Sequence, residues 1–149
     1  MIKFSKPKRP VHTVFIHASA SDNPKHDDVS VIKQWHLERG FRTVGYHYFI
    51  KKDGTLQEGR HLSSVPAAQR GHNTGTIAIC LSGLDEDKFT EEQFKTLREL
   101  CAVINGRYQG KIKFRGHREV NPNKTCPVFD YKKVLKIDST HHIFFDRRT

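Results

Sequence analysis

Apolar, β-branched and aromatic residues gather in three short runs along the chain, separated by polar segments. These runs cover residues 11–16, 45–52 and 76–82. Val, Ile, Tyr and Phe favour extended backbone, and a short apolar run between polar segments is typical of a buried strand. A fourth, shorter strand is predicted for residues 111–115. The pattern therefore predicts a β-sheet with a hydrophobic core on it.

Turn-forming residues divide these strands. The pair Asp53-Gly54 predicts a hairpin turn, after which residues 55–60 return as a further strand. Residues 63–73 are rich in small and polar side chains and predict a loop.

Two longer segments carry apolar residues at helical spacing. Residues 29–39 form an amphipathic pattern that Gly40 ends as a C-cap. The second helix begins with Thr-Glu-Glu-Gln at residues 90–93, a capping box in which the Thr and Gln side chains bond each other's backbone N–H groups. Its apolar stripe consists of Phe94, Leu97, Leu100, Cys101 and Ile104. A short helix is predicted for residues 130–136.

Strands and helices interleave without an internal repeat, a linker or a low-complexity block. We therefore expect one α/β domain over residues 1–149, with a central mixed β-sheet flanked by helices. Its core would span about residues 11–136, followed by a basic tail at residues 137–149.

The composition agrees with a packed globular protein. The chain has 149 residues, 36% of them hydrophobic, with ten Phe, four Tyr and one Trp. Its three cysteines are an odd, widely spaced set, unlike the disulfide framework of a small secreted domain. Cys80 and Cys101 lie in apolar patterns and are expected in the core, whereas Cys126 lies in a polar loop.

The chain is strongly basic, with a formal net charge of +10. This charge favours a polyanionic partner, such as nucleic acid, an anionic cell envelope or acidic peptides, or else forms a solvated basic surface. Small clusters occur at residues 6–9 and near Arg147. Charge alone is a weak argument for nucleic acid, so no nucleic-acid partner is expected. No signal peptide is visible in residues 1–10 and no run approaches a membrane span, so we expect synthesis in the cytoplasm.

Three residues far apart in the chain form a candidate metal site. His17 follows the first apolar run, at the point where that strand is predicted to end, and His117 and Cys126 lie in the loop after the last strand. Two imidazoles and a thiolate are ligands that zinc accepts, and a site with three protein ligands keeps a position for water or substrate. Spacing alone leaves the alternative that these are structural or exposed residues.

Several ordered motifs resemble one family. They read Phe-Ile-His-Ala-Ser-Ala (15–20), Val-Gly-Tyr-His-Tyr-Phe-Ile (44–50), Asp-Gly with Glu-Gly-Arg (53–60), Gly-His-Asn with Ile-Ala-Ile-Cys-Leu-Ser-Gly (71–83), and Gly-His with Lys-Thr-Cys-Pro (116–127). Together they resemble the zinc-dependent N-acetylmuramoyl-L-alanine amidases, the type-2 amidase superfamily that includes the peptidoglycan-recognition proteins. The likeness is greatest to the small amidase-type lysozymes of bacteriophages.

The resemblance implies a role for each matching residue. The ligands of one catalytic Zn²⁺ fall on His17, His117 and Cys126, and the catalytic residues fall on Tyr46 and Lys124. One departure shows, because the loop that carries Lys124 is one residue longer than in the nearest phage relatives.

Physical chemistry suggests how Lys124 and Tyr46 would act. Lys124 would stabilise the negative charge that develops on the attacked carbonyl. Tyr46 would position water or that oxygen and is a poor general base, since a phenol with a pKa of about 10 is mostly protonated at neutral pH. The alternatives are a solvated loop lysine and an aromatic residue packed in the core.

Other polar residues near these motifs could have either a structural or a functional role. His47 follows Tyr46 directly, so strand alternation predicts the opposite face and a structural role. His72 and Asn73 either line a substrate groove or form a plain turn. Glu119 either holds an imidazole of the site or is a solvated carboxylate.

The resemblance implies a peptidoglycan hydrolase that cuts the amide between N-acetylmuramic acid and the L-alanine of the stem peptide. We expect a monomeric phage or prophage endolysin that reaches the periplasmic cell wall after holin-type release. One alternative is a peptidoglycan-binding protein without activity, although such relatives typically lack the third ligand, which Cys126 supplies here. Another is a regulator of a phage RNA polymerase.

Overall fold

A mixed five-stranded sheet forms the centre of the computed structural model, which describes residues 2–146. The strands are β1 (Thr13–Ala18), β2 (Tyr48–Ile50), β3 (Leu56–Glu58), β4 (Thr76–Leu81) and β5 (Lys113–Gly116). They lie in the order β3-β2-β4-β1-β5, with β3 antiparallel to β2 and the other neighbours parallel. This confirms the predicted mixed α/β architecture.

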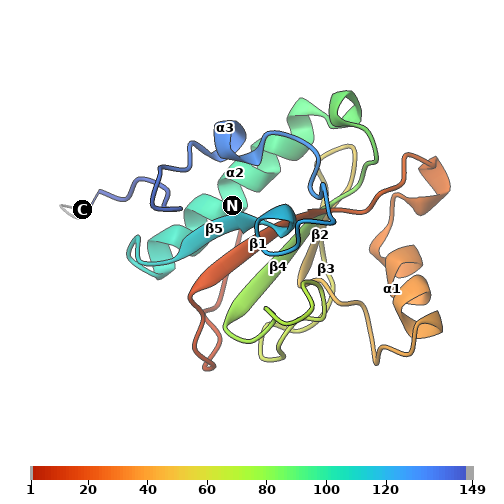
Figure 1. Cartoon of the computed structure of the whole chain (residues 1–149), viewed down its shortest axis with the longest axis horizontal. Helices are drawn as coiled ribbons and strands as arrows, with labels where there is room; N and C mark the ends of the chain where they lie inside the picture. The colour runs from red at the N-terminus through yellow and green to blue at the C-terminus, as the bar shows by residue number, and fades with distance from the viewer. Residues whose placement is uncertain (1, 147–149) are drawn as a thin grey trace.

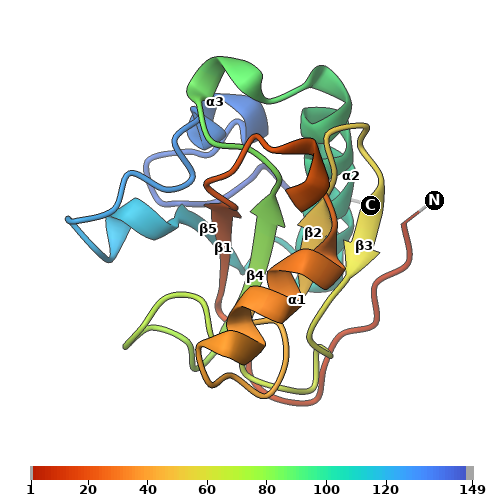
Figure 2. The same ribbon diagram turned by 90° about the vertical axis from the view of Figure 1, so that its right-hand side faces the viewer.

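Helices cover both faces of this sheet (Figures 1 and 2). The helix α1 (Val29–Glu38) lies on one face and α2 (Glu91–Arg107) on the other. A short helix, α3 (Tyr131–Leu135), packs beside α2. Three single-turn 3₁₀ helices occupy loops, at Pro24–His26 (η1), Glu86–Lys88 (η2) and His117–Glu119 (η3). The basic cluster predicted near Arg147 lies outside the described residues.

The predicted capping box starts α2 and also ties it to the sheet. Thr90 Oγ1 accepts a hydrogen bond from Gln93 N at 3.1 Å, and Gln93 Oε1 accepts one from Thr90 N at 2.9 Å. The buried Gln93 amide then donates to the carbonyls of Ser82 and Ile50, at 2.9 and 3.2 Å. One side chain therefore fixes the start of the helix against the ends of β4 and β2.

Two strands differ in extent from the sequence prediction. β2 begins only at Tyr48, although His47 N still donates to Ala78 O of β4 at 2.9 Å; Gly45 N donates instead to His36 Nδ1 of α1 at 2.7 Å. β1 extends to Ala18 and includes His17, whose ladder partner is Cys80 of β4. His17 is therefore held within the sheet, where we expected the start of a loop.

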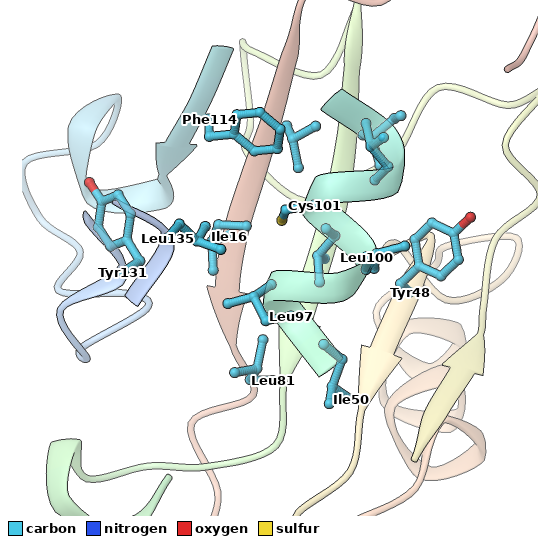
Figure 3. Packing of buried hydrophobic residues seen from close by; sticks show 14 of the residues in the cluster. Ile16, Tyr48, Ile50, Leu81, Leu97, Leu100, Cys101, Phe114, Tyr131 and Leu135 are labelled. Atoms are coloured by element: carbon cyan, nitrogen blue, oxygen red, sulfur yellow. The ribbon is translucent and has the colours of Figure 1, made fainter. Parts of the chain in front are cut away.

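The larger core lies between the sheet and α2. Leu97, Leu100 and Cys101 of α2 pack against strand residues such as Ile16 and Tyr48 (Figure 3). A smaller cluster on the opposite face joins α1 to the sheet through Ile32, Val44, Phe49 and Cys80. Cys80 and Cys101 are fully buried, as the sequence predicted. Among the described residues, no helix is both long and apolar enough to cross a membrane.

Candidate metal centre

The fold brings His17, His117 and Cys126 together. Because β1 and β5 are parallel neighbours, His17 near the end of β1 lies close to His117, which directly follows β5. The ring centroids of the two histidines are 4.8 Å apart, and Cys126 Sγ lies 3.8 Å from His17 Nδ1. The possible ligand atoms of all three residues lie within 4.8 Å of one another.

Backbone hydrogen bonds return the loop after η3 to the sheet. Arg118 N donates to the carbonyl of Cys126 at 2.8 Å, and Ala18 N donates to Cys126 Sγ at 3.1 Å. Between these points, Lys124 N donates to Asn121 O at 3.0 Å and closes a turn. The loop is thus closed at both ends, which places the Cys126 sulfur beside β1.

Glu119 anchors the start of this loop. Its carboxylate accepts a hydrogen bond from Gly116 N at 2.7 Å and another from the Tyr131 hydroxyl of α3. It also lies 3.6 Å from Arg115 Nε and 3.3 Å from His141 Nδ1. Neither reading made from the sequence is correct for this residue, because its side chain is only 14% exposed and its contacts are to these four groups.

Gln69 is a buried partner of the site that the sequence did not suggest. It is fully buried, and its Oε1 lies 2.8 Å from His17 Nε2. Its Nε2 donates to Thr76 Oγ1 at 2.7 Å and to the His72 carbonyl at 3.2 Å. With Nε2 of His17 bonded to an acceptor, Nδ1 is the nitrogen that faces Cys126.

Burial keeps both imidazoles neutral at neutral pH. It lowers the pKa of His17 to about 3, with a further contribution from the neighbouring His117. Burial and the positive charge of Lys124 lower the pKa of His117. Burial raises the pKa of the Cys126 thiol to about 11, although the Ala18 N–H and the Lys124 charge act in the opposite direction. A bound cation would favour the thiolate, which is the form that ligates metals.

The chemistry of this donor set fits zinc. Two neutral imidazole nitrogens and one thiolate are ligands that zinc accepts, and three protein ligands leave a further position for water or substrate. A hydrogen-bonded second nitrogen, as on His17, is typical of a metal-ligating histidine. These three residues are therefore the ones that would hold the ion.

The Tyr46 ring lies beside the trio. Its centroid is 5.1 Å from that of His17, and it also contacts His36 of α1 at 5.4 Å. Burial, followed by the proximity of Cys80 and Cys126, raises its pKa well above the ordinary value. The phenol is therefore protonated at neutral pH and can donate a hydrogen bond.

Lys124 and His72 are exposed side chains that act electrostatically on residues of the trio. Lys124 lowers the pKa values of both His117 and Cys126, and His72 contributes to the shift of His117. Asn73 has a different environment, because its Oδ1 accepts hydrogen bonds from Ala68 N at 3.0 Å and Gln69 N at 2.9 Å. Asn73 therefore shapes the loop that carries Gln69, and His72 is the better candidate to meet a ligand.

His47 has the structural role predicted for it. It is 1% exposed, and its Nδ1 accepts a hydrogen bond from Ala78 N of β4 at 3.1 Å. Its Nε2 lies 2.8 Å from the Ser64 carbonyl. The side chain therefore joins the loop after β3 to the centre of the sheet.

The α/β domain thus has two histidines and a cysteine that converge where the parallel strands β1 and β5 end, a group that could hold a metal ion. A family model described as N-acetylmuramoyl-L-alanine amidase matches residues 7–129, and the chain belongs to this family. The matched range contains all three residues of the trio.

Individual proteins agree with this assignment. The endolysins of Enterobacteria phage T3 and Escherichia phage T7 are each 38% identical to the chain over 134 residues, covering 86% of this chain and 87% of theirs. The N-acetylmuramoyl-L-alanine amidase LysC from Clostridium intestinale URNW superposes with a TM-score of 0.76 at 24% identity. The superposition covers 86% of this chain and 85% of LysC, which shows a shared fold.

Proposed function

We propose that this peptidoglycan amidase of the endolysin type is a zinc-dependent hydrolase. It would cut the amide bond between the lactyl group of N-acetylmuramic acid and the L-alanine of the stem peptide. The convergence of His17, His117 and Cys126 carries the proposal, because their ligand atoms lie within 4.8 Å of one another. The family match and the phage endolysins support the choice of substrate.

The residues of the trio would hold the ion in a defined way. His17 would bind through Nδ1, because its Nε2 is bonded to Gln69. Cys126 would bind as a thiolate, with the Ala18 N–H as an additional donor to its sulfur. A zinc ion held there would supply Lewis acidity, which lowers the pKa of a bound water toward neutrality and polarises a carbonyl.

Two neighbouring residues would assist the reaction. Lys124 carries a positive charge next to His117 and Cys126, where it would stabilise the negative charge that develops on the carbonyl oxygen. The protonated Tyr46 hydroxyl would donate a hydrogen bond that orients the attacking water or the carbonyl. His72, on the exposed loop beside the site, would contact the stem peptide.

Access to the substrate is a separate part of the proposal. The bond is in the cell wall, and no helix of the described residues could span a membrane. Release to the periplasm through a holin would bring the protein to the cell wall.

Mass analysis of digested peptidoglycan tests the proposed bond. Purified protein should release stem peptides with free L-alanine amino termini and leave glycan strands with intact lactyl groups. New reducing sugar ends would indicate a glycosidase, and binding without any release would indicate a recognition domain.

A further inference from the structure

A cavity that shares no residue with the trio lies between the N-terminal segment and the chain that follows β3. Its volume is about 600 Å³. In Figure 2 the N-terminal segment passes beside β3. The charged side chains that line the cavity are Lys3, Lys6, Lys8, Arg9, Arg60 and Glu58. Five cations and one carboxylate give this lining a net charge of +4 when its two histidines, His47 and His61, are neutral.

The two arginines of the cavity are fixed in place. Arg9 Nε donates to the carbonyl of Leu62 at 2.8 Å, and its Nη2 lies 3.3 Å from His47 Nε2. Arg60 donates to the carbonyls of Val44 at 3.0 Å and Val65 at 2.9 Å. Because the acceptors that hold these guanidinium groups are neutral backbone carbonyls, the positive charges of the two arginines remain in the cavity wall.

Arg9 also has an unpaired donor. Its Nη1 is buried and has no hydrogen-bond partner among the residues that the structure describes. A buried donor on a charged group is costly to leave unpaired, and like charges around one cavity repel each other. An anion in the cavity would relieve both costs.

We propose that this cavity binds a phosphoryl group. A phosphate carries up to two negative charges and several acceptor oxygens. It therefore suits a pair of guanidinium groups held in place and three exposed lysine ammonium groups better than a single carboxylate does. The group can belong to a small free phosphate or to the headgroup of an anionic lipid. In both cases the lysines at residues 3, 6 and 8 would close over it.

The cavity is independent of the proposed metal centre. Its lining residues fall within 3–9, 47–48 and 58–63 and include none of His17, His117 and Cys126. The site would therefore bind phosphate whether or not the trio holds zinc.

The test compares two triple variants with equal net charge. Lys3→Gln, Lys6→Gln and Lys8→Gln remove the exposed lysine cations of the cavity and keep the two arginines that support the fold. The matched control, Lys33→Gln, Lys95→Gln and Lys132→Gln, removes three exposed lysines outside the cavity lining. Binding of inorganic pyrophosphate is measured by calorimetry, and the amide groups it perturbs are located by NMR.

We expect one pyrophosphate per wild-type chain, with perturbed amides in residues 3–9 and 58–63. The cavity triple should bind at least about tenfold more weakly, because three charges near the anion are lost, and the control triple should bind as the wild type does. Vesicles of phosphatidylcholine with phosphatidylglycerol give the second arm. Tighter binding to these vesicles than to pyrophosphate, lost in the cavity triple alone, supports the site with a lipid as the source.

Three results would overturn the proposal. The first is equal weakening in both triples, which is a general effect of net charge. The second is perturbation confined to residues 117–126, which places the anion at the metal centre. The third is no binding of either probe to the wild type.

Discussion

Gln69 fixes the ring nitrogen that His17 presents to the metal centre. The Thr76 hydroxyl donates to the carbonyl of Asn73 at 2.8 Å, so it accepts from the Gln69 amide nitrogen at 2.7 Å. The amide oxygen of Gln69 is thereby turned toward His17 Nε2, 2.8 Å away. His17 must then carry its proton on Nε2, which leaves the lone pair of Nδ1 for a metal.

Replacing Gln69 with Leu should weaken metal binding. The apolar side chain leaves the buried Nε2–H of His17 without an acceptor and removes the preference for one tautomer. We expect zinc affinity to fall about 10- to 100-fold, the usual effect of losing such an outer partner. Competition with a chromophoric chelator measures the affinity. The exposed Gln34→Leu on α1 is the control and should bind zinc as the wild type does; an unchanged Gln69→Leu would remove the orienting role.

The sequence predicted much of this site because its residues carry local signals. His17, His117 and Cys126 stand in ordered motifs, and the capping box and Asp53-Gly54 turn depend on neighbouring residues alone. The hairpin formed as expected, with Gly54 at φ +88° and Gly54 N donating to Lys51 O at 2.9 Å.

Residues whose partners are distant in the chain could not be predicted. Gln69 lies in a loop of small polar residues, and no local pattern shows that it is buried against His17, 52 positions away. The role of Glu119 depends on Tyr131 and His141, which only the folded C-terminal segment brings near. The bond of Gly45 N to His36 likewise joins residues whose contact no local pattern shows.

Tyr46→Phe tests whether the hydroxyl takes part in the reaction. The ring contacts with His17 and His36 are retained, so stability and zinc content should not change. Loss of one hydrogen bond to developing charge should lower kcat about 10- to 100-fold. Because the pKa of Tyr46 is raised, the wild-type rate should also show no step from its ionisation between pH 7 and 9. A full-rate Tyr46→Phe enzyme would assign this residue to packing alone.

Lys124→Ala should separate metal binding from turnover. The side chain is exposed and is not a ligand, so the variant should retain zinc. Removing a positive group near the developing oxyanion should reduce kcat about 10²- to 10³-fold, with a smaller change in KM. Lys132→Ala, at an exposed position on α3, is the matched control. Activity equal to that of the control would exclude Lys124 from the mechanism.

Two buried histidines away from the trio should make stability depend on pH. Burial lowers the pKa values of His36 and His47 to about 4 each, and the Nδ1 of each accepts a backbone N–H bond. Below the unfolded pKa of about 6.5, only the unfolded chain gains these protons. The stability present above pH 6.5 should therefore be lost as the pH falls toward 4, by up to about 1.4 kcal/mol per pH unit for each imidazole.

Urea unfolding at pH 7, 6 and 5, with a chelator present, measures this slope. His47→Gln should reduce it, whereas the exposed His72→Gln should leave it unchanged. A free energy of unfolding that stays constant from pH 7 to 5 would contradict the assignment of neutral, buried imidazoles.

The most direct test combines metal content with lysis of chloroform-permeabilised Gram-negative cells. Wild-type protein should hold one zinc ion per chain and clear the suspension. A chelator should stop the clearing, and added zinc should restore it. Cys126→Ala should hold no zinc and lyse no cells. The matched cysteine variant Cys101→Ala, in the core, should still bind zinc and lyse cells. Lysis that is insensitive to the chelator and to Cys126→Ala would contradict the proposed zinc centre.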